Sequence, residues 1–91
     1  MPRALVINAD ADFRSVCRAT LEGAGYEAQE AGDAAGGVRA FARRPADLVL
    51  CAVDGEGPTA AWAIRVLRHD ARVLAVSGHA ELEEAVRKAA G

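Results

Sequence analysis

The sequence has few aromatic residues, few cysteines and no long apolar run. Aromatic residues make up 4% of the 91-residue chain, so a core must be built from Ala, Val, Leu and Ile, which suits helices packed on a parallel sheet. No apolar stretch approaches the length of a membrane span, and the apolar run near Met1 is too short for a signal peptide. We therefore expect a cytoplasmic protein with no membrane partner.

Clusters of like charge and of metal ligands are also absent from the sequence. The formal net charge is −2, and no run of Lys or Arg indicates a nucleic-acid partner. Cys17 and Cys51 have no second Cys or His at metal-ligand spacing, so both are expected to be buried thiols in a reducing compartment. No nucleophile, base and orienting acid can be assembled, and no glycine-rich phosphate loop follows the first strand. We expect neither enzymatic activity nor a cofactor.

Apolar runs alternate with helical periods along the chain, which is typical of strand–helix units around a parallel sheet. Continuously apolar runs predict buried strands, and periodic stretches predict helices. Strands are predicted at residues 4–7, 26–30, 48–53 and from 72 or 73 to 77, and helices at about 11–22, 34–43, 59–68 and 81–90. Asp10 and Asp33 are placed to cap the first two helices, and residues 54–59 are predicted to form a loop.

Four segments, in chain order, resemble the response-regulator receiver domain. They are LVINADADFR at 5–14, LEGAGYEA at 21–28, RPADLVL at 44–50 and VLAVSGH at 73–79. The resemblance covers essentially the whole chain and implies one domain over residues 1–91. It implies an α/β, flavodoxin-like (CheY-like) open parallel sheet in strand order 2-1-3-4, truncated before the family's fifth strand and helix. The predicted crossovers are right-handed, with helices on both faces of the sheet.

A receiver holds Mg²⁺ with three carboxylates at the ends of its first and third strands, and one of them accepts a phosphoryl group. The resemblance places the acidic pair at Asn8 and Ala9 and the phosphoacceptor at Ala52, so all three carboxylates are missing. The switch hydroxyl falls on Ser77, and the fifth-strand Lys would lie beyond Gly91. We interpret the chain as a pseudo-receiver that keeps the scaffold and loses the chemistry.

Nearby carboxylates leave alternatives open. Asp54 lies two residues after Ala52 and is a candidate substitute acceptor, although a solvated loop acid is the simpler interpretation. Asp10 and Asp54 could form a weak cation site with Asn8, but helix capping already explains Asp10. Without a phosphoryl group, Ser77 is expected to make local bonds at the end of its strand. A third alternative is a small-ligand-binding domain that uses the vacated cleft.

The third predicted helix carries an unusual apolar stripe. Its core face is set by Ala60, Ala63, Ile64 and Leu67. This face puts Trp62 and Val66 nearly opposite, where polar residues are expected, so the two are candidates for a binding surface. The alternative is a rotated helix with Trp62 at the edge of the core. His69 and His79 are expected to be ordinary surface residues.

The absent fifth unit is expected to leave apolar surface uncovered. In a complete receiver, that unit covers the outer edge of the fourth strand and the open side of the first helix. We therefore expect a homodimer that shields this surface. The resemblance implies protein partners of the signalling-kinase or output-domain kind. The predicted function is a phosphorylation-independent interaction module in two-component-type signal transduction.

Overall fold

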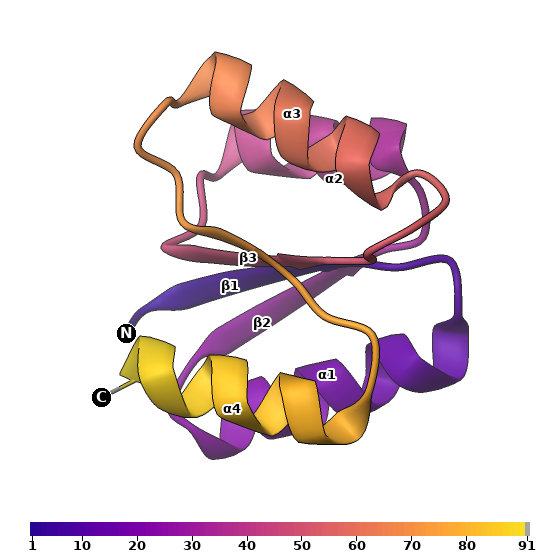
Figure 1. The fold of residues 1–91 in the computed structure, drawn as a ribbon. Coiled ribbons are helices and arrows are strands. Elements are labelled where there is room, and N and C mark those ends of the chain that lie inside the picture. The colour runs from indigo at the N-terminus through magenta and orange to yellow at the C-terminus, as the bar shows by residue number, and fades with distance from the viewer. Residues whose placement is uncertain (91) are drawn as a thin grey trace.

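Strands and helices alternate along the computed structural model, which describes residues 1–90 (Figure 1). The elements are β1 (Arg3–Ile7), α1 (Ala11–Gly23), β2 (Glu27–Ala31), α2 (Ala34–Arg43), β3 (Leu48–Cys51), α3 (Gly57–Leu67), β4 (Val73–Ala75) and α4 (His79–Ala90). All strand pairs are parallel, and the sheet order is β2-β1-β3-β4. The predicted class and topology are confirmed. Within residues 1–90, no helix is both long enough and apolar enough to cross a membrane.

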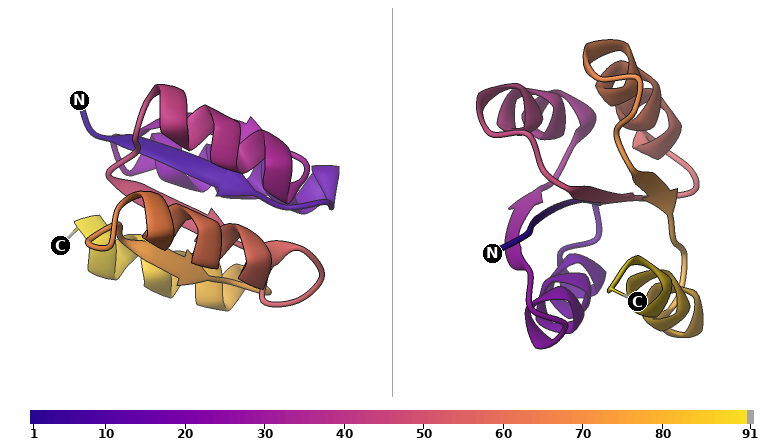
Figure 2. Two further views of the ribbon diagram at one scale, coloured as in Figure 1. Left: turned by 90° about the horizontal axis from the view of Figure 1, so that it is seen from above. Right: turned by 90° about the vertical axis from the view of Figure 1, so that its left-hand side faces the viewer.

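Helices cover both faces of the sheet, with α2 and α3 on one side and α1 and α4 on the other (Figure 2). Alternate residues of the central strands serve the two layers. Leu5 and Val49 pack in a cluster with α2 and α3, which we name the α2/α3 core. Val6 and Leu50 pack in a cluster with α1 and α4, named the α1/α4 core. The continuous apolar runs of β1 and β3 are thereby explained, because both faces of these strands are buried.

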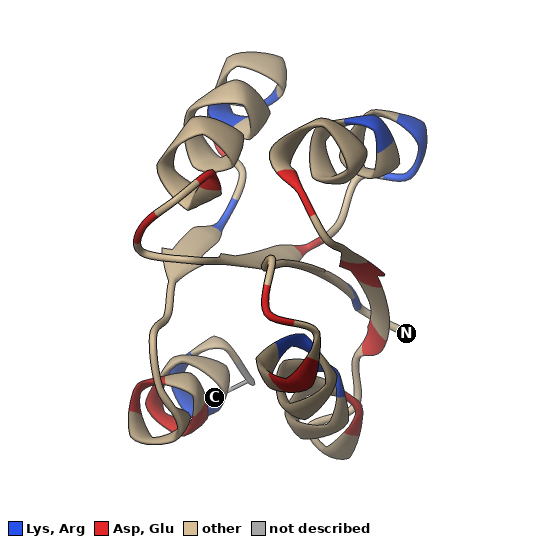
Figure 3. Cartoon of the chain, turned by 90° about the vertical axis from the view of Figure 1, so that its right-hand side faces the viewer, with Lys and Arg blue, Asp and Glu red and all other residues tan. Residues whose placement is uncertain are grey.

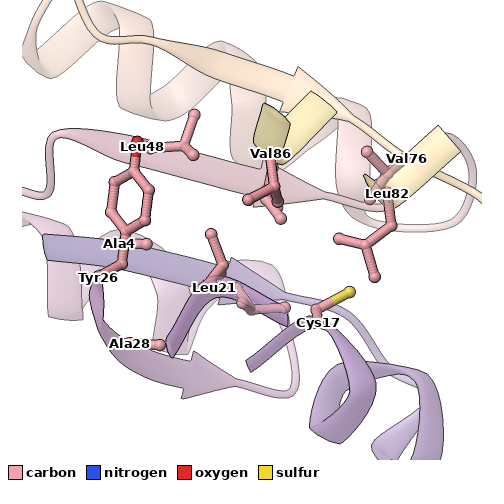
Figure 4. Close-up of a cluster of buried hydrophobic side chains, with 11 residues drawn as sticks. Ala4, Cys17, Leu21, Tyr26, Ala28, Leu48, Val76, Leu82 and Val86 are labelled. Atoms are coloured by element: carbon pink, nitrogen blue, oxygen red, sulfur yellow. The ribbon is translucent and has the colours of Figure 1, made fainter. Parts of the chain in front are cut away.

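Helix α4 corrects one expectation about exposed surface. Leu82 and Val86 of α4 are 1% and 4% exposed, and they share the α1/α4 core with Cys17 and Leu21 of α1 (Figure 4). The prediction that the open side of the first helix lies bare is therefore wrong. The buried side chain of Val76 belongs to the same core, so the chain leaves β4 toward the α1 face and α4 covers the apolar side of α1.

The predicted caps of α1 and α2 are confirmed. Asp10 Oδ1 accepts hydrogen bonds from the N–H groups of Asp12 and Phe13, at 3.0 and 3.2 Å. Asp33 Oδ1 accepts from the N–H of Gly36 at 2.7 Å. The bounds of α2 are those predicted, and α1 extends one residue further. Local capping chemistry therefore fixes both helix starts.

The segment after β3 differs from its prediction. The strand ends at Cys51 rather than at residue 53, and α3 begins at Gly57, two residues earlier than expected. The N–H of Gly57 donates to the carbonyl of Asp54 at 3.0 Å, and Gly55 adopts a positive φ of 58°. The predicted loop is therefore displaced toward the N-terminus: residues 52–56 connect β3 to α3, and residues 57–59 belong to α3.

Smaller differences affect the remaining boundaries. Strand β2 is shifted by one residue toward the C-terminus, β4 ends at Ala75, and α4 begins two residues early at His79. Helix α2 contains two adjacent glycines, and a Cβ at Gly37 would overlap the side chain of Ile7 on β1. The glycine that weakens α2 as an isolated helix is thus what allows it to approach the sheet.

Candidate functional site: a vacated cleft at the carboxyl edge of the sheet

The fold brings most of the predicted site residues together where the strands end. A cleft of about 660 Å³ is lined by residues from the segments after β1, β3 and β4. Its lining includes five predicted positions: Asn8, Asp10, Ala52, Asp54 and Ser77. Ala9 lines a neighbouring cleft of about 350 Å³, which shares the first four of these residues. Parallel strands place their carboxyl ends at one edge, so this convergence follows from the topology.

The polar side chains after β1 are used to start α1. Asn8 Oδ1 accepts from the N–H of Asp10 at 2.9 Å, and Asp10 Oδ1 accepts from the first turn of α1. Arg14 completes the arrangement, because its Nη1 donates to the carbonyl of Asn8 at 2.7 Å and its Nε pairs with Glu30 at 2.9 Å. The side-chain oxygens of Asn8 and Asp10 therefore accept hydrogen bonds from backbone N–H groups. The interpretation of Asp10 as a helix cap is confirmed.

Ser77 is held by a residue that the sequence analysis did not single out. Its N–H donates to Glu81 Oε1 at 3.1 Å, and its Oγ donates to Glu81 Oε2 at 3.3 Å. Glu81 lies in the first turn of α4, which begins at His79, and its carboxylate reaches back to Ser77, two residues before the helix. The local bonding expected for Ser77 is confirmed, and the Ser-x-x-x-Glu spacing was the available signal for its partner.

Ala52 directly follows β3, and Asp54 begins the turn that leads to α3. The half-buried Ala52 is approached so closely by the first residue of α3 that a Cβ at Gly57 would overlap the Ala52 carbonyl. Asp54 is exposed and lines both clefts. The turn therefore presents a methyl group at the end of β3 and a solvated carboxylate beside it.

An aromatic stack closes one side of the larger cleft. The rings of Phe13 in α1 and His79 in α4 have centroids 5.9 Å apart and planes within 10° of parallel. His79 is exposed, as predicted, but its stacking joins the two helices at the cleft. Residues this far apart in sequence carry no local pattern that predicts their contact.

Acidic groups dominate the electrostatics of this edge. Asp10, Asp12 and Asp54 line the larger cleft, and Asp33 and Glu56 are added in the smaller one. No Lys or Arg lines either cleft in the described part of the chain, and Figure 3 shows acidic segments at this edge. Among residues 1–90, no three His, Cys, Asp or Glu side chains are grouped so as to hold a metal ion. Such a field disfavours an anionic ligand.

The two thiols do not serve the site. Cys17 and Cys51 are both buried free cysteines, as predicted. Burial raises the pKa of Cys17 to about 11 and also raises the pKa of Cys51. Because a thiolate is the nucleophilic form, neither residue is an activated nucleophile.

The chain matches no protein-family model and no curated protein by sequence. Solved structures do match it in shape. Chemotaxis protein CheY4 of Vibrio cholerae aligns with a TM-score of 0.78 and 21% identity, over 100% of this chain and 81% of that chain. A CheY-like receiver domain protein of Methanospirillum hungatei aligns with a TM-score of 0.78 and 25% identity, over 100% of this chain and 76% of that chain. Response regulator TrrA of Thermotoga maritima, in complex with Mg²⁺–BeF, aligns with a TM-score of 0.81 and 23% identity, over 98% of this chain and 99% of that chain.

The chain has the CheY-like receiver fold. The resemblance noted in four sequence segments is therefore matched by a similarity of fold over 98–100% of this chain. Within this receiver fold, the cleft lies at the edge where the resemblance places the acidic pair and the phosphoacceptor. The resemblance assigns those positions to Asn8, Ala9 and Ala52.

The apolar stripe of α3 lies outside the cleft. Trp62 is 70% exposed and Val66 is 65% exposed, as the helical wheel predicted, and the rotated alternative is not observed. Leu67 was assigned to the core face, but it is 51% exposed. It is the last residue of α3, and a wheel gives the angle of a residue about the axis rather than its position along it.

Proposed function

We propose that this chain is a pseudo-receiver: a domain that keeps the receiver fold, accepts no phosphoryl group and acts as a protein-interaction module in two-component-type signalling. The observation that carries the proposal is the methyl group of Ala52 at the end of β3. A methyl group cannot form an acyl phosphate, and neither Asn8 nor Ala9 supplies a carboxylate for Mg²⁺.

The surroundings of Ala52 support this proposal. TrrA was crystallised with Mg²⁺–BeF, whereas a phosphoryl-sized anion in this cleft would face the carboxylates of Asp10 and Asp54. The hydroxyl of Ser77, which would act as the switch, is bonded to Glu81. The proposed domain is non-catalytic, needs no cofactor and works in the cytoplasm. Its partner class is a signalling kinase or an output domain.

Incubation with acetyl phosphate and Mg²⁺, followed by intact-mass spectrometry, tests the proposal. We expect no phosphoryl adduct, because no carboxylate stands at the end of β3. An adduct that is stable in acid and labile in base, and that disappears in Asp54→Asn but persists in Asp12→Asn, would instead identify an atypical receiver phosphorylated at Asp54. Stabilisation by a nucleotide or a metal in a thermal-shift screen would favour a small-ligand-binding domain.

We also propose self-association, now restricted to one surface. Helix α4 covers the open side of α1, which leaves the strand edge as the candidate. Within residues 1–90, no strand pairs with the outer edge of β4. Leu74 lies opposite Leu50 in the ladder, so the backbone groups of Val73 and Ala75 point away from β3. The Val73 carbonyl accepts from Arg65 Nη2 at 3.1 Å, and the backbone of Ala75 is the part of this edge proposed to pair with a second copy.

A further inference from the structure

The α2/α3 layer is basic along its helices. Helix α2 contains Arg39 and Arg43, helix α3 contains Arg65, and neither helix contains Asp or Glu. The other layer is mixed, because α4 contains Glu81, Glu83 and Glu84 besides two basic residues, and α1 has two of each sign. Figure 3 shows the basic segments on the α2/α3 layer. The acids before these helices, among them Asp33 and Glu56, lie at the carboxyl edge.

Helix electrostatics explain only part of this bias. Basic residues in the last turn of a helix interact favourably with its macrodipole, which accounts for Arg43 and Arg65. Arg39 lies mid-helix, where that interaction is weak. Helix α4 also has basic residues in its last turn, yet it carries three glutamates. A favourable interaction of basic residues with the helix macrodipole therefore does not explain why α2 and α3 contain no acidic residue.

The three arginines also lack acidic partners. Within residues 1–90, the ion pairs involve other cations: Arg44 pairs with Glu27 and Arg68 pairs with Asp70, for example, whereas Arg39, Arg43 and Arg65 pair with no carboxylate. All three are exposed. Their charge is therefore not neutralised within the described part of the chain.

The same layer carries the largest exposed apolar side chains of the described helices. Trp62 and Val66 are one helical turn apart on one side of α3, and Leu67 is exposed at the end of the helix on another side. Helices α2 and α3 lie side by side on the sheet (Figures 1 and 2). Tryptophan and arginine are both typical residues of binding hot spots. Two adjacent helices offer ridges and grooves on which a third helix can pack.

We propose that this surface, formed by Arg39, Arg43, Trp62, Arg65 and Val66, docks an amphipathic acidic helix of a partner protein. Trp62 and Val66 would contact the apolar face of that helix, and the arginines would face Asp or Glu at its flanks. The inference rests on the proposed interaction function and specifies the chemistry of its partner.

Charge argues against a second copy of this chain as the occupant. A two-fold dimer through this surface would bring two identical sets of three arginines together. The acidic helix α4 of another copy buries its large apolar residues Leu82 and Val86 in its own core. It therefore has no free apolar face to set against Trp62.

Panning a displayed library of peptides against the intact chain tests this proposal. The library has Leu at one helical face and random residues at the flanks, and the best binder is then synthesised. We expect the enriched flanks to be rich in Asp and Glu. Trp62 is the only tryptophan, so its fluorescence emission reports directly on the site and should shift to the blue as the peptide binds. Binding should weaken as salt is raised.

Charge reversal supplies a matched pair of variants. Arg39→Glu combined with Arg43→Glu should weaken binding of the acidic peptide about tenfold or more, because like charges then face each other. Arg87→Glu, on the opposite layer, should leave the affinity unchanged. The salt dependence of peptide binding to the unaltered chain also reports whether charge attraction contributes to the affinity, and it does not depend on any variant.

Three results would overturn the proposal. The first is that the selected peptides have neutral or basic flanks. The second is that acidic peptides bind but do not change the emission of Trp62. The third is that panning against the unaltered chain enriches peptides no more than panning against the Trp62→Ala variant. Each would leave the pseudo-receiver proposal intact, provided that acetyl phosphate gives no adduct. A phosphoryl adduct on Asp54 would instead contradict the pseudo-receiver proposal.

Discussion

Gly57 is the residue on which the geometry of the cleft most depends. It is the first residue of α3, and a Cβ there would overlap the carbonyl oxygen of Ala52. The obstacle is backbone rather than a flexible side chain, so α3 must shift to admit a methyl group. This contact fixes where β3 ends and where the turn toward α3 begins.

Gly57→Ala is expected to destabilise the protein by about 1–3 kcal/mol, the usual cost of overpacking. The matched control is Gly23→Ala at the end of α1, where an added Cβ meets no atom within 4 Å. There the substitution should be neutral or slightly stabilising, because alanine restricts the unfolded chain. Urea unfolding of the two variants gives the comparison, and equal stabilities would contradict the close approach of α3 to Ala52.

Cys17 predicts a pH dependence of stability. Its pKa rises from the usual 9.0 to about 11 through burial. Between these values the unfolded chain releases a proton that the folded chain keeps, so the free energy of unfolding falls as pH rises. The associated loss is about 2–3 kcal/mol when the interval has been crossed, and below pH 9 the stabilising contribution is fully present.

Urea unfolding between pH 8 and 11 measures this loss. Cys17→Ala should show a shallower decline than the unaltered chain, although a cavity lowers its stability at every pH. Cys51 stays in both proteins, so its own raised pKa cancels in the comparison. Parallel pH profiles would show that the Cys17 thiol titrates normally.

Among the elements, α4 determines how much apolar surface the domain exposes. It packs on the same face of the sheet as α1, and its buried side chains belong to the α1/α4 core. An exposed helix at the end of the chain would contribute little to stability. A docked helix is part of the cooperative unit.

Leu82→Ala should therefore cost about 2–5 kcal/mol, as for other buried leucines. Leu67→Ala offers a matched control of the same chemistry, because Leu67 is 51% exposed while Leu82 is 1% exposed. We expect the control to cost less than about 0.5 kcal/mol. Thermal or urea unfolding of both variants decides the matter, and a small effect of Leu82→Ala would mean that α4 is not docked on α1.

The sequence predicts these elements well where a local signal exists. The caps at Asp10 and Asp33 specify helix starts, and the apolar runs of β1 and β3 specify central strands. The full strand order was implied by the receiver resemblance. The side of the sheet chosen by α4 could not be predicted, because Leu82 and Val86 define an apolar face without naming the surface that it meets. Side choice depends on packing between distant segments.

The candidate site could be predicted only where its residues follow from the order of the strands. Asn8, Ala52 and Ser77 converge because they follow neighbouring parallel strands, which is a property of the topology. The Phe13–His79 stack and the position of Gly57 against Ala52 depend on tertiary distances. Within residues 1–90, Arg39, Arg43 and Arg65 form no ion pair, and this too could be found only from the positions of the described carboxylates.

At the scale of the whole molecule, the outer edge of β4 predicts weak dimerisation. The strand has three residues, so an antiparallel pair formed with a second copy makes few hydrogen bonds. We expect a monomer–dimer equilibrium at high micromolar concentration, measured by sedimentation equilibrium. Ala75→Pro removes an outward N–H and should abolish the dimer, because Leu74 provides the ladder bonds to β3.

The conservative control for this experiment is Ala75→Ser, which keeps the N–H and should still dimerise. Both variants need a thermal unfolding curve beside the sedimentation data. If the unaltered chain stays monomeric at high micromolar concentration, the outer edge of β4 does not pair with a second copy. Its short length and the bond from Arg65 to the Val73 carbonyl would then be enough to prevent pairing.

The two-sided use of β1 and β3 has a consequence for how this domain can change in length. Neighbouring residues of these strands serve opposite cores, so one inserted or deleted residue would turn every following side chain to the wrong core. Substitutions in these strands alter one core at a time. Mutational drift should therefore accept changes of residue type in β1 and β3, while changes of length are confined to exposed connections such as residues 68–70 between α3 and β4.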